Sequence, residues 1–174
     1  MAVSAKMEVV IKDACILFDL IDLDLLASFY GLSLFVITTP EVMAEITDEN
    51  QLSQVNVYIE SGQLQIDSSG DFDEHRQIVD QNPGLSLTDA SVLDLATRRK
   101  ATVLSSDKSL RNESQRRGLT VRGVLWILEE LYLQQILTVD VMLEKLKAYP
   151  EMNKWAPRSH IDALIKKYSP EPKP

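Results

Sequence analysis

The feature that most constrains the fold is an alternation of short apolar runs with longer segments of helical periodicity. Each apolar run has the length of a single strand and gives way to a polar or turn-forming residue. Because parallel strands need a crossover that a helix usually supplies, this alternation predicts a parallel sheet with helices on both faces. We therefore expect an α/β fold, a three-layer α/β/α sandwich with a mostly parallel central sheet. Its strands are expected at residues 7–12, 34–37, 63–66, 101–104 and 119–121.

Helices are expected where apolar residues recur every three or four positions between capping and stop signals. Thr39 and Thr88 are the expected N-caps of two helices, and Pro40 suits the first helical position after Thr39. Gly31 and Gly118 are expected to end two others. The predicted helices cover residues 14–31 (as one helix or two), 40–46, 52–60, 71–80, 88–100, 108–117, 124–135, 139–148 and 160–168.

The chain of 174 residues fits one domain with a short appendage. We expect a main domain over residues 1–135 and a C-terminal helical extension over residues 136–174, packed on the same domain. Cys15 is the only cysteine, which excludes an intrachain disulfide and fits a reducing cytoplasm. The N-terminus lacks the apolar stretch of a signal peptide, and acids interrupt the longest apolar runs. A cytoplasmic protein without a membrane span is the prediction.

The charge is unevenly distributed along the chain. The net charge of -8 argues against a protein that coats nucleic acid nonspecifically, because such binding depends on neutralising phosphates. Between Asp13 and Thr97 the only basic residue is Arg76. The following basic strip fits either a solvated helix surface or a phosphate-binding face, and the sequence leaves both open. We define the basic strip as Arg98, Arg99, Lys100, Lys108, Arg111, Arg116, Arg117 and Arg122.

Four acids recur at the same kind of position. Asp13 and Asp107 stand where an apolar strand gives way to a helix, Asp89 lies at the mouth of its helix, and Glu45 lies one turn into the helix after the second strand. In open α/β sheets the functional crevice lies outside the carboxyl ends of the strands, so all four can point into one crevice. Taken singly, each is also what helix capping or dipole compensation predicts.

Several carboxylates in one crevice repel one another and must either protonate or bind a cation. A hard divalent ion such as Mg²⁺ or Mn²⁺ suits an all-oxygen site, where it can activate water for phosphodiester hydrolysis. The chain offers no competing GxGxxG, P-loop, CxxC or HExxH motif. Glu41 competes with Glu45 for its place, but as a first-turn acid after Pro40 it is explained by the helix dipole.

Other reactive side chains give weaker signals. Asp94 is expected to face away from Asp89, either as a surface acid or as a partner for Arg98 four residues later. His75 and His160 are isolated in sequence, and surface positions are expected for both. Cys15 sits in an apolar segment and is expected to be a buried, inert thiol.

Four stretches carry a family resemblance: VIKDACIL, TTPEVMAEI, LSLTDASVLDLA and TVLSSDKSLRNESQRRGLTVRGVLWIL. Their order and strand contexts, and the alanine after both Asp13 and Asp89, resemble the successive motifs of the PIN (PilT N-terminus) domain family. The Gly-x-x-Val-x-Gly stretch at residues 118–123 is similar to that of prokaryotic PIN-like proteins related to VapC-type toxins. The resemblance is good over residues 9–127 and looser over the C-terminal helices.

The resemblance implies a Mg²⁺- or Mn²⁺-dependent ribonuclease on a Rossmann-like sheet, in which metal-bound water attacks an RNA phosphate without a covalent enzyme intermediate. Asp13, Asp89 and Asp107 match the metal-binding aspartates, and Glu45 matches the fourth catalytic acid. Ser105 matches a small hydroxyl residue that supports the last aspartate. A homodimer, and in many members an antitoxin partner, is also implied.

The residues near the last aspartate extend this interpretation. Lys108 and Arg111 lie close to Asp107 in sequence and are candidates for phosphate contacts, although a solvated surface explains them as well. An RNA-binding or scaffolding protein with little activity is the main alternative. A phosphatase or receiver fold with Asp13 as nucleophile is disfavoured, because Cys15 stands where a phosphatase would have a second acid.

Overall fold

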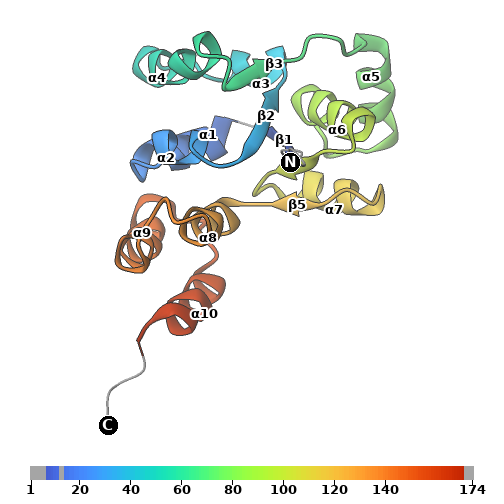
Figure 1. Cartoon of the computed structure of the whole chain (residues 1–174). Helices are drawn as coiled ribbons and strands as arrows, with labels where there is room; N and C mark the ends of the chain where they lie inside the picture. Colours follow the sequence, from blue (N-terminus) through green and yellow to red (C-terminus); the bar gives the residue numbers. More distant parts are fainter. Residues whose placement is uncertain (1–6, 12–13, 171–174) are drawn as a thin grey trace, which may run out of the picture. The chain divides into compact units, whose positions relative to one another are not determined.

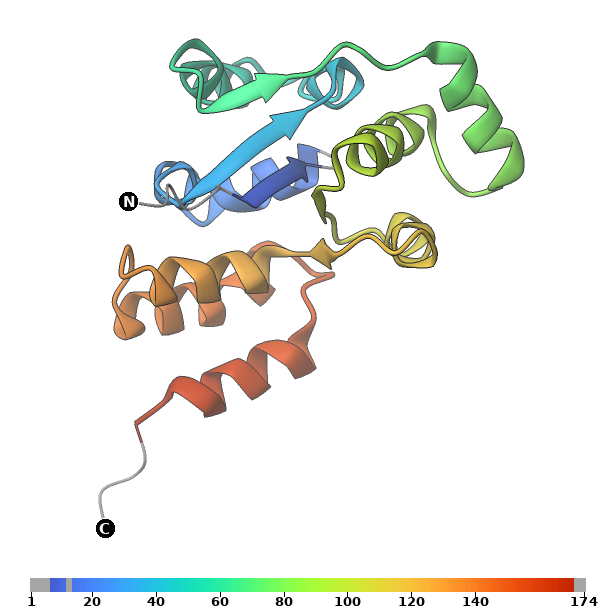
Figure 2. The ribbon, with the colours of Figure 1, turned by 45° about the vertical axis from the view of Figure 1, so that its right-hand side comes forward.

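The sheet is parallel throughout, as predicted. In the computed structural model, which describes residues 7–11 and 14–170, five strands form one sheet in the order β3-β2-β1-β4-β5. Every pairing is parallel, with Val9 of β1 beside Val36 of β2 and Thr102 of β4. Figure 2 shows β1, β2 and β3 pointing the same way. The strands are β1 (Met7–Ile11), β2 (Leu34–Thr38), β3 (Leu64–Ile66), β4 (Thr102–Leu104) and β5 (Val121–Arg122).

The expected helices are present, with ends that move by a few residues (Figure 1). The segment at residues 14–31 forms two helices, because Asp24 adopts a left-handed φ of 55° that interrupts the helical backbone. Gly31 is the C-cap of the second, although in right-handed conformation. The helices are α1 (Ala14–Asp22), α2 (Leu26–Tyr30), α3 (Pro40–Ala44), α4 (Glu49–Glu60), α5 (Phe72–Gln81), α6 (Leu87–Arg99), α7 (Lys108–Arg116), α8 (Val124–Leu133), α9 (Val139–Met152) and α10 (Arg158–Tyr168).

The chain divides into two compact units. The first comprises Met1–Phe18 and Ser33–Gly123 and holds the whole sheet with α3 to α7. The second comprises Asp19–Leu32 and Val124–Pro174 and holds α2 and α8 to α10. The expected division into residues 1–135 and 136–174 stays a prediction.

Helix α6 is the central helix of the first unit. It contacts β1 and β4 as well as α3, α5 and α7. Its residues 89–96 are all buried, and Leu93 and Leu95 are fully so. A fully buried leucine contributes about 2 kcal/mol of transfer free energy, so this apolar face fixes the helix against the sheet. The core around it contains Ile37, Val42, Leu85, Val92, Leu93, Leu95, Ala96, Ala101, Val103, Leu110 and Val121.

The second unit is held by packing and by two polar ties. Asp19 is buried and accepts hydrogen bonds from the Tyr149 hydroxyl (2.9 Å) and the Asn153 amide (3.0 Å). Glu129 accepts from Tyr168 (2.9 Å) and from Lys167 (3.0 Å), and the Tyr168 and Glu129 contacts raise the pKa of Lys167. Among the described residues no helix combines the length and apolar character needed to cross a bilayer.

Candidate functional site

Three of the four predicted acids belong to elements that meet at one edge of the sheet. Helices α3 and α7 start directly after β2 and β4, at the carboxyl ends of these strands. Helix α6 precedes β4 and packs on it, so α6 runs back across the sheet and its N-terminus lies at that same edge. Asp89 and Asp107 are therefore carried to one side of the sheet, whereas Glu45 follows the last residue of α3, and the three acids form no metal-holding group among the described residues. Asp13 follows β1 but lies outside the described residues.

Asp89 is held by a capping box at the start of α6. Its Oδ2 accepts from the Ser86 backbone N–H (2.8 Å), and its own N–H donates to Ser86 Oγ (3.0 Å). The prediction that Thr88 caps this helix is wrong, because Ser86 is the N-cap and Asp89 supplies the reciprocal bond three residues later. Asp89 is only 6% exposed, so its carboxylate has one fixed orientation at the positive end of the helix dipole.

Asp107 is the N-cap of α7. Its Oδ1 accepts from the Leu110 backbone N–H (2.9 Å), and its own N–H donates to Ser105 Oγ (3.0 Å). Ser105 is fully buried, and its backbone N–H donates to the Arg122 carbonyl (2.9 Å), which joins it to β5. Arg111 donates to the Ser105 carbonyl (3.3 Å). The predicted support of Asp107 by Ser105 is thus present as a hydrogen bond, while its role at a metal stays a prediction.

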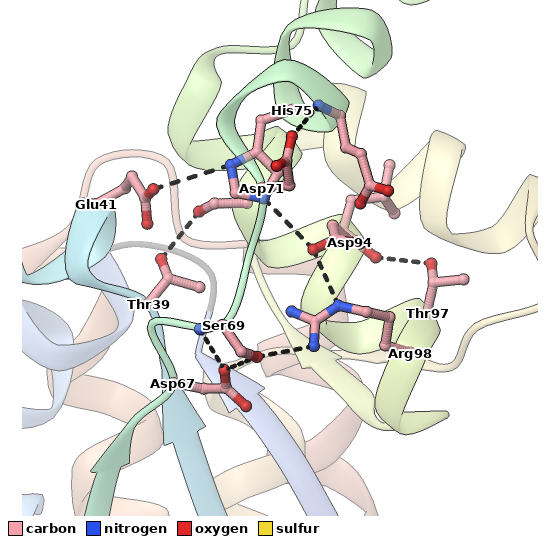
Figure 3. Close-up of polar contacts among 12 residues, drawn as sticks. Thr39, Glu41, Asp67, Ser69, Asp71, His75, Asp94, Thr97 and Arg98 are labelled. Carbon is pink, nitrogen blue, oxygen red and sulfur yellow. Dashed lines mark hydrogen bonds and ion pairs between the residues drawn. The ribbon is translucent and has the colours of Figure 1, made fainter.

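The two glutamates of α3 point to different surroundings. Glu45 is the C-cap of α3 and is exposed. Glu41 is half-buried, and its Oε1 lies 3.9 Å from His75 Nδ1 (Figure 3). The preference for Glu45 over Glu41 stays a prediction, but it accords with a Glu41 carboxylate that is already committed to His75.

Four of the eight residues of the basic strip form ion pairs with acids of the same chain. Glu113 accepts from Arg116 (2.7 Å) and from Arg117 (2.8 Å), and these guanidinium groups lower the pKa of Glu113 while Glu113 raises that of Arg116. Arg98 and Arg99 are paired as well, at 3.1 Å and 3.0 Å from their acids. The ion pairs of these four arginines favour the structural interpretation for this half, because each guanidinium group already has a carboxylate partner in the protein.

Lys108 and Arg111 are the candidates that remain beside the acids. Lys108 is exposed and Arg111 half-buried, and the first turns of α7 hold both next to Asp107. Within the described ranges no carboxylate lies within ion-pair distance of either. Their side chains thus keep a charge that a phosphate could use, which stays a prediction.

The donor chemistry of these acids fits a hard divalent cation. Asp89 and Asp107 present carboxylate oxygens, the ligands that Mg²⁺ and Mn²⁺ prefer. Residues 7–11 and 14–170 contain no group of three or more His, Cys, Asp or Glu side chains that could hold a metal by themselves. The described residues thus make no metal site by themselves, and Asp13, which follows the central strand β1 in the sequence, stays a predicted ligand.

Sequence reasoning misjudged three reactive residues. His75 is 4% exposed, not on the surface, and its Nε2 lies 3.4 Å from Asp94 Oδ2 (Figure 3). Asp94 pairs with Arg98 as predicted, but it is buried. Cys15 is exposed, so the expectation of a buried thiol is wrong. The available signal for His75 was Gly70, since only a residue without Cβ lets the ring pack against the backbone there.

Comparisons with known proteins agree with this fold. The crystal structure of PAE2754 from Pyrobaculum aerophilum is similar with a TM-score of 0.53, over 74% of this chain and 98% of that chain. Its sequence identity of 14% supports likeness of fold alone. A comparison with curated proteins found no match.

The decisive comparison is with a family model. The model described as DUF3368: PIN domain matches residues 9–169, which covers most of both compact units. PIN domains are generally nucleases that use divalent metal ions and bind nucleic acid. The chain belongs to the PIN domain family.

Proposed function

We propose that this protein is a metal-dependent endoribonuclease in which Asp13, Asp89 and Asp107 hold Mg²⁺ or Mn²⁺ and Glu45 completes the catalytic acids. The observation that carries the proposal is the placement of Asp89 and Asp107. Both carboxylates are fixed by capping hydrogen bonds at helix N-termini, at the edge of a parallel sheet where the strands end. That edge is where open α/β sheets bind their ligands.

The capping hydrogen bonds hold Asp89 and Asp107 in place for the proposed binding of a cation. Asp89 Oδ2 and Asp107 Oδ1 each accept a hydrogen bond from a backbone N–H, which holds each carboxylate in one orientation. Ser105 is uncharged, but its hydroxyl oxygen accepts a hydrogen bond from the Asp107 N–H and so holds the Asp107 backbone in place. A bound divalent ion would supply a Lewis acid that activates water and neutralises charge on the phosphoryl group.

Substrate attraction is assigned to Lys108 and Arg111. Both stand in the first turns of α7, next to Asp107, where a phosphate approaching the acids would pass. An endonuclease acting on RNA meets one phosphate per nucleotide, so a few cations beside the site suffice even though the whole chain carries a net charge of -8.

The toxin role is a further part of the proposal. An antitoxin or a second copy of the chain would need an apolar surface, and Leu133, Met152 and Trp155 of the second unit are more than half exposed. A small reading frame directly upstream, whose product copurifies with this chain and inhibits it, would support the toxin role. An upstream product that neither binds this chain nor inhibits it, or no such reading frame at all, would count against it.

Cleavage of a fluorescent single-stranded RNA by the full chain tests the activity. With Mn²⁺ or Mg²⁺ we expect endonucleolytic products, and with EDTA none. Asp89→Asn should remove cleavage, whereas the matched Asp140→Asn, in the first turn of α9, should retain it. RNA binding without cleavage under any divalent metal would contradict the proposal and favour an RNA-binding or scaffolding role.

A further inference from the structure

The short helix α3 depends on its neighbours for its position. It has five residues, and a helix of that length has no stability of its own in water. Its N-cap Thr39 bonds to Ser91 of α6, with 2.9 Å between the hydroxyl oxygens. Because Ser91 donates to the Thr88 carbonyl (2.8 Å), Thr39 is the donor to Ser91 and accepts in turn from the Val42 N–H. This bond fixes only the N-terminal end of α3.

A second tie reaches α3 through a buried histidine. Arg98 Nε donates to Asp94 Oδ2 (3.1 Å), and the same oxygen lies 3.4 Å from His75 Nε2. On the other side of the ring, His75 Nδ1 lies 3.9 Å from Glu41 Oε1 (Figure 3). The ring thus stands between a carboxylate of α6 and one of α3, and it is 4% exposed.

The surroundings leave the ring little room to move. A Cβ on Gly70 would come within 2.7 Å of two atoms of the His75 ring, so the glycine is needed for this close approach. A cavity of about 30 Å³ adjoins the ring and is lined by residues of α3, α5, α6 and the loop after β3. That volume holds about one water molecule, which is enough to bridge the longer gap to Glu41.

We infer that His75 is a positioning residue that ties Glu41 of α3 to Asp94 of α6 and thereby sets where Glu45 stands. The inference deepens the proposed function and rests on it for the role of Glu45. The tie itself is a property of the fold and can be measured without any catalytic activity.

The two nitrogens of the His75 ring face carboxylates on different helices. The charged groups around the ring are Glu41 from α3 and Asp94 with Arg98 from α6. In the loop before α5, Asp67 is already paired with Arg99, and Asp71 caps α5 itself. Glu41 is therefore the carboxylate through which the ring reaches α3.

Amide hydrogen exchange in the full chain tests the tie directly. The probes are the N–H groups of Met43 and Glu45, which bond within and just after α3, with Leu52 of α4 as internal reference. We expect His75→Gln to lower the protection factors of the two α3 amides several-fold relative to Leu52, because the contact between His75 and Glu41 is lost. The control His160→Gln, an exposed histidine of α10, should leave them unchanged.

A second variant separates positioning from general loss of packing. Glu41→Gln leaves His75 and Asp94 in place and removes only the carboxylate charge that faces the ring. In a folded protein it should lower the protection of the same two α3 amides. If α3 protection stays within twofold of wild type in both variants, the inference is wrong.

The rate of RNA cleavage at saturating Mn²⁺ tests the consequence for Glu45, which the proposed function places among the catalytic acids and not among the metal ligands. His75→Gln should cleave several-fold more slowly than His160→Gln. Loosened α3 amides with an unchanged cleavage rate would overturn the positioning role. Should the wild-type chain cleave no RNA, the proposed nuclease fails while the exchange data still decide whether His75 holds α3.

Discussion

At the scale of single residues, two of the proposed metal ligands also cap helices. Asp107 and Asp89 are genuine helix caps, which is what a purely local interpretation of the sequence predicts. The same hydrogen bonds orient their carboxylates. Capping and metal binding are therefore compatible, and the choice of substitution decides which of the two an experiment reports.

Asp107→Asn separates the two roles, because asparagine caps a helix about as well as aspartate but lacks the charge. We expect RNA cleavage to be lost while the free energy of unfolding changes by less than about 0.5 kcal/mol. Asp107→Ala should lose cleavage and about 1 kcal/mol of stability as well. Cleavage assays and urea unfolding of the two variants provide the comparison, and an active Asp107→Asn would exclude this residue from the chemistry.

A second residue-scale prediction concerns Asp67. Hydrogen bonds from Ser69, together with Arg99, lower its pKa from 3.8 to about 2 despite its partial burial. Because the pKa is lower in the folded chain, Asp67 contributes stability above about pH 4 that is lost as the pH falls towards 2. After allowance for solvent screening, this pKa shift corresponds to about 1 to 2 kcal/mol of folding free energy.

Urea unfolding at pH 5.5 and at about pH 2.5 measures this contribution. Asp67→Asn should lower the free energy of unfolding at the higher pH. The difference between the free energies of unfolding at the two pH values should therefore be smaller than in the wild type. Asp162→Asn, in the second unit, serves as control. Equal pH dependence in wild type and Asp67→Asn would contradict the assignment.

At the scale of elements, local sequence signals placed the helices and strands but not all their contacts. Strand and helix positions follow from periodicity and from caps such as Thr39, and the structure confirms them. The start of α6 was missed by two residues, because Ser86 and Thr88 are both good caps and only the reciprocal bond of Asp89 chooses between them.

The burial of His75 and Asp94 could not be predicted from the sequence, for a different reason. Each looks like a surface residue on its own helix, and only the packing of α5 on α6 brings them together. Of the candidate site, the sequence could predict the edge of the sheet, while its assignment of the acids stays a prediction. The orientation of α3, with Glu41 turned to His75, depends on tertiary contacts that no local pattern encodes.

The capping box makes an element-scale prediction. Ser86→Ala removes the side-chain acceptor for the Asp89 N–H and should cost about 1 kcal/mol of stability. Thr138→Ala, which removes the equivalent cap of α9, should cost a similar amount and is the matched control. Only Ser86→Ala should also slow RNA cleavage, because it frees the Asp89 backbone. Equal cleavage by both variants would show that the box has no role in the site.

At the scale of the whole molecule, charge is arranged so that an acidic protein keeps a few cations beside its acids. Four arginines of the basic strip are used in internal ion pairs, and Lys108 and Arg111 remain next to Asp107. RNA binding should therefore involve few phosphates and depend only modestly on salt.

Binding of single-stranded RNA in Ca²⁺ or EDTA, measured over a range of salt concentrations, checks this arrangement. Lys108→Ala and Arg111→Ala should each reduce the slope of log K against log salt by about 0.7, the loss of one phosphate contact on a single strand. Arg116→Ala should leave the slope unchanged, because Arg116 is paired with Glu113. A larger loss in Arg116→Ala than in Lys108→Ala would contradict the assigned path of the substrate.

The central claim is that acids at the carboxyl edge of the sheet form one divalent-metal site. Titration of Mn²⁺ into the wild-type chain and into Asp13→Asn, Asp89→Asn and Asp140→Asn, followed by calorimetry, tests it most directly. We predict binding by the wild type and Asp140→Asn, and at least about tenfold weaker binding by the other two, the loss of one charged ligand. Equal affinity in all four proteins, or no binding by the wild type, would contradict it.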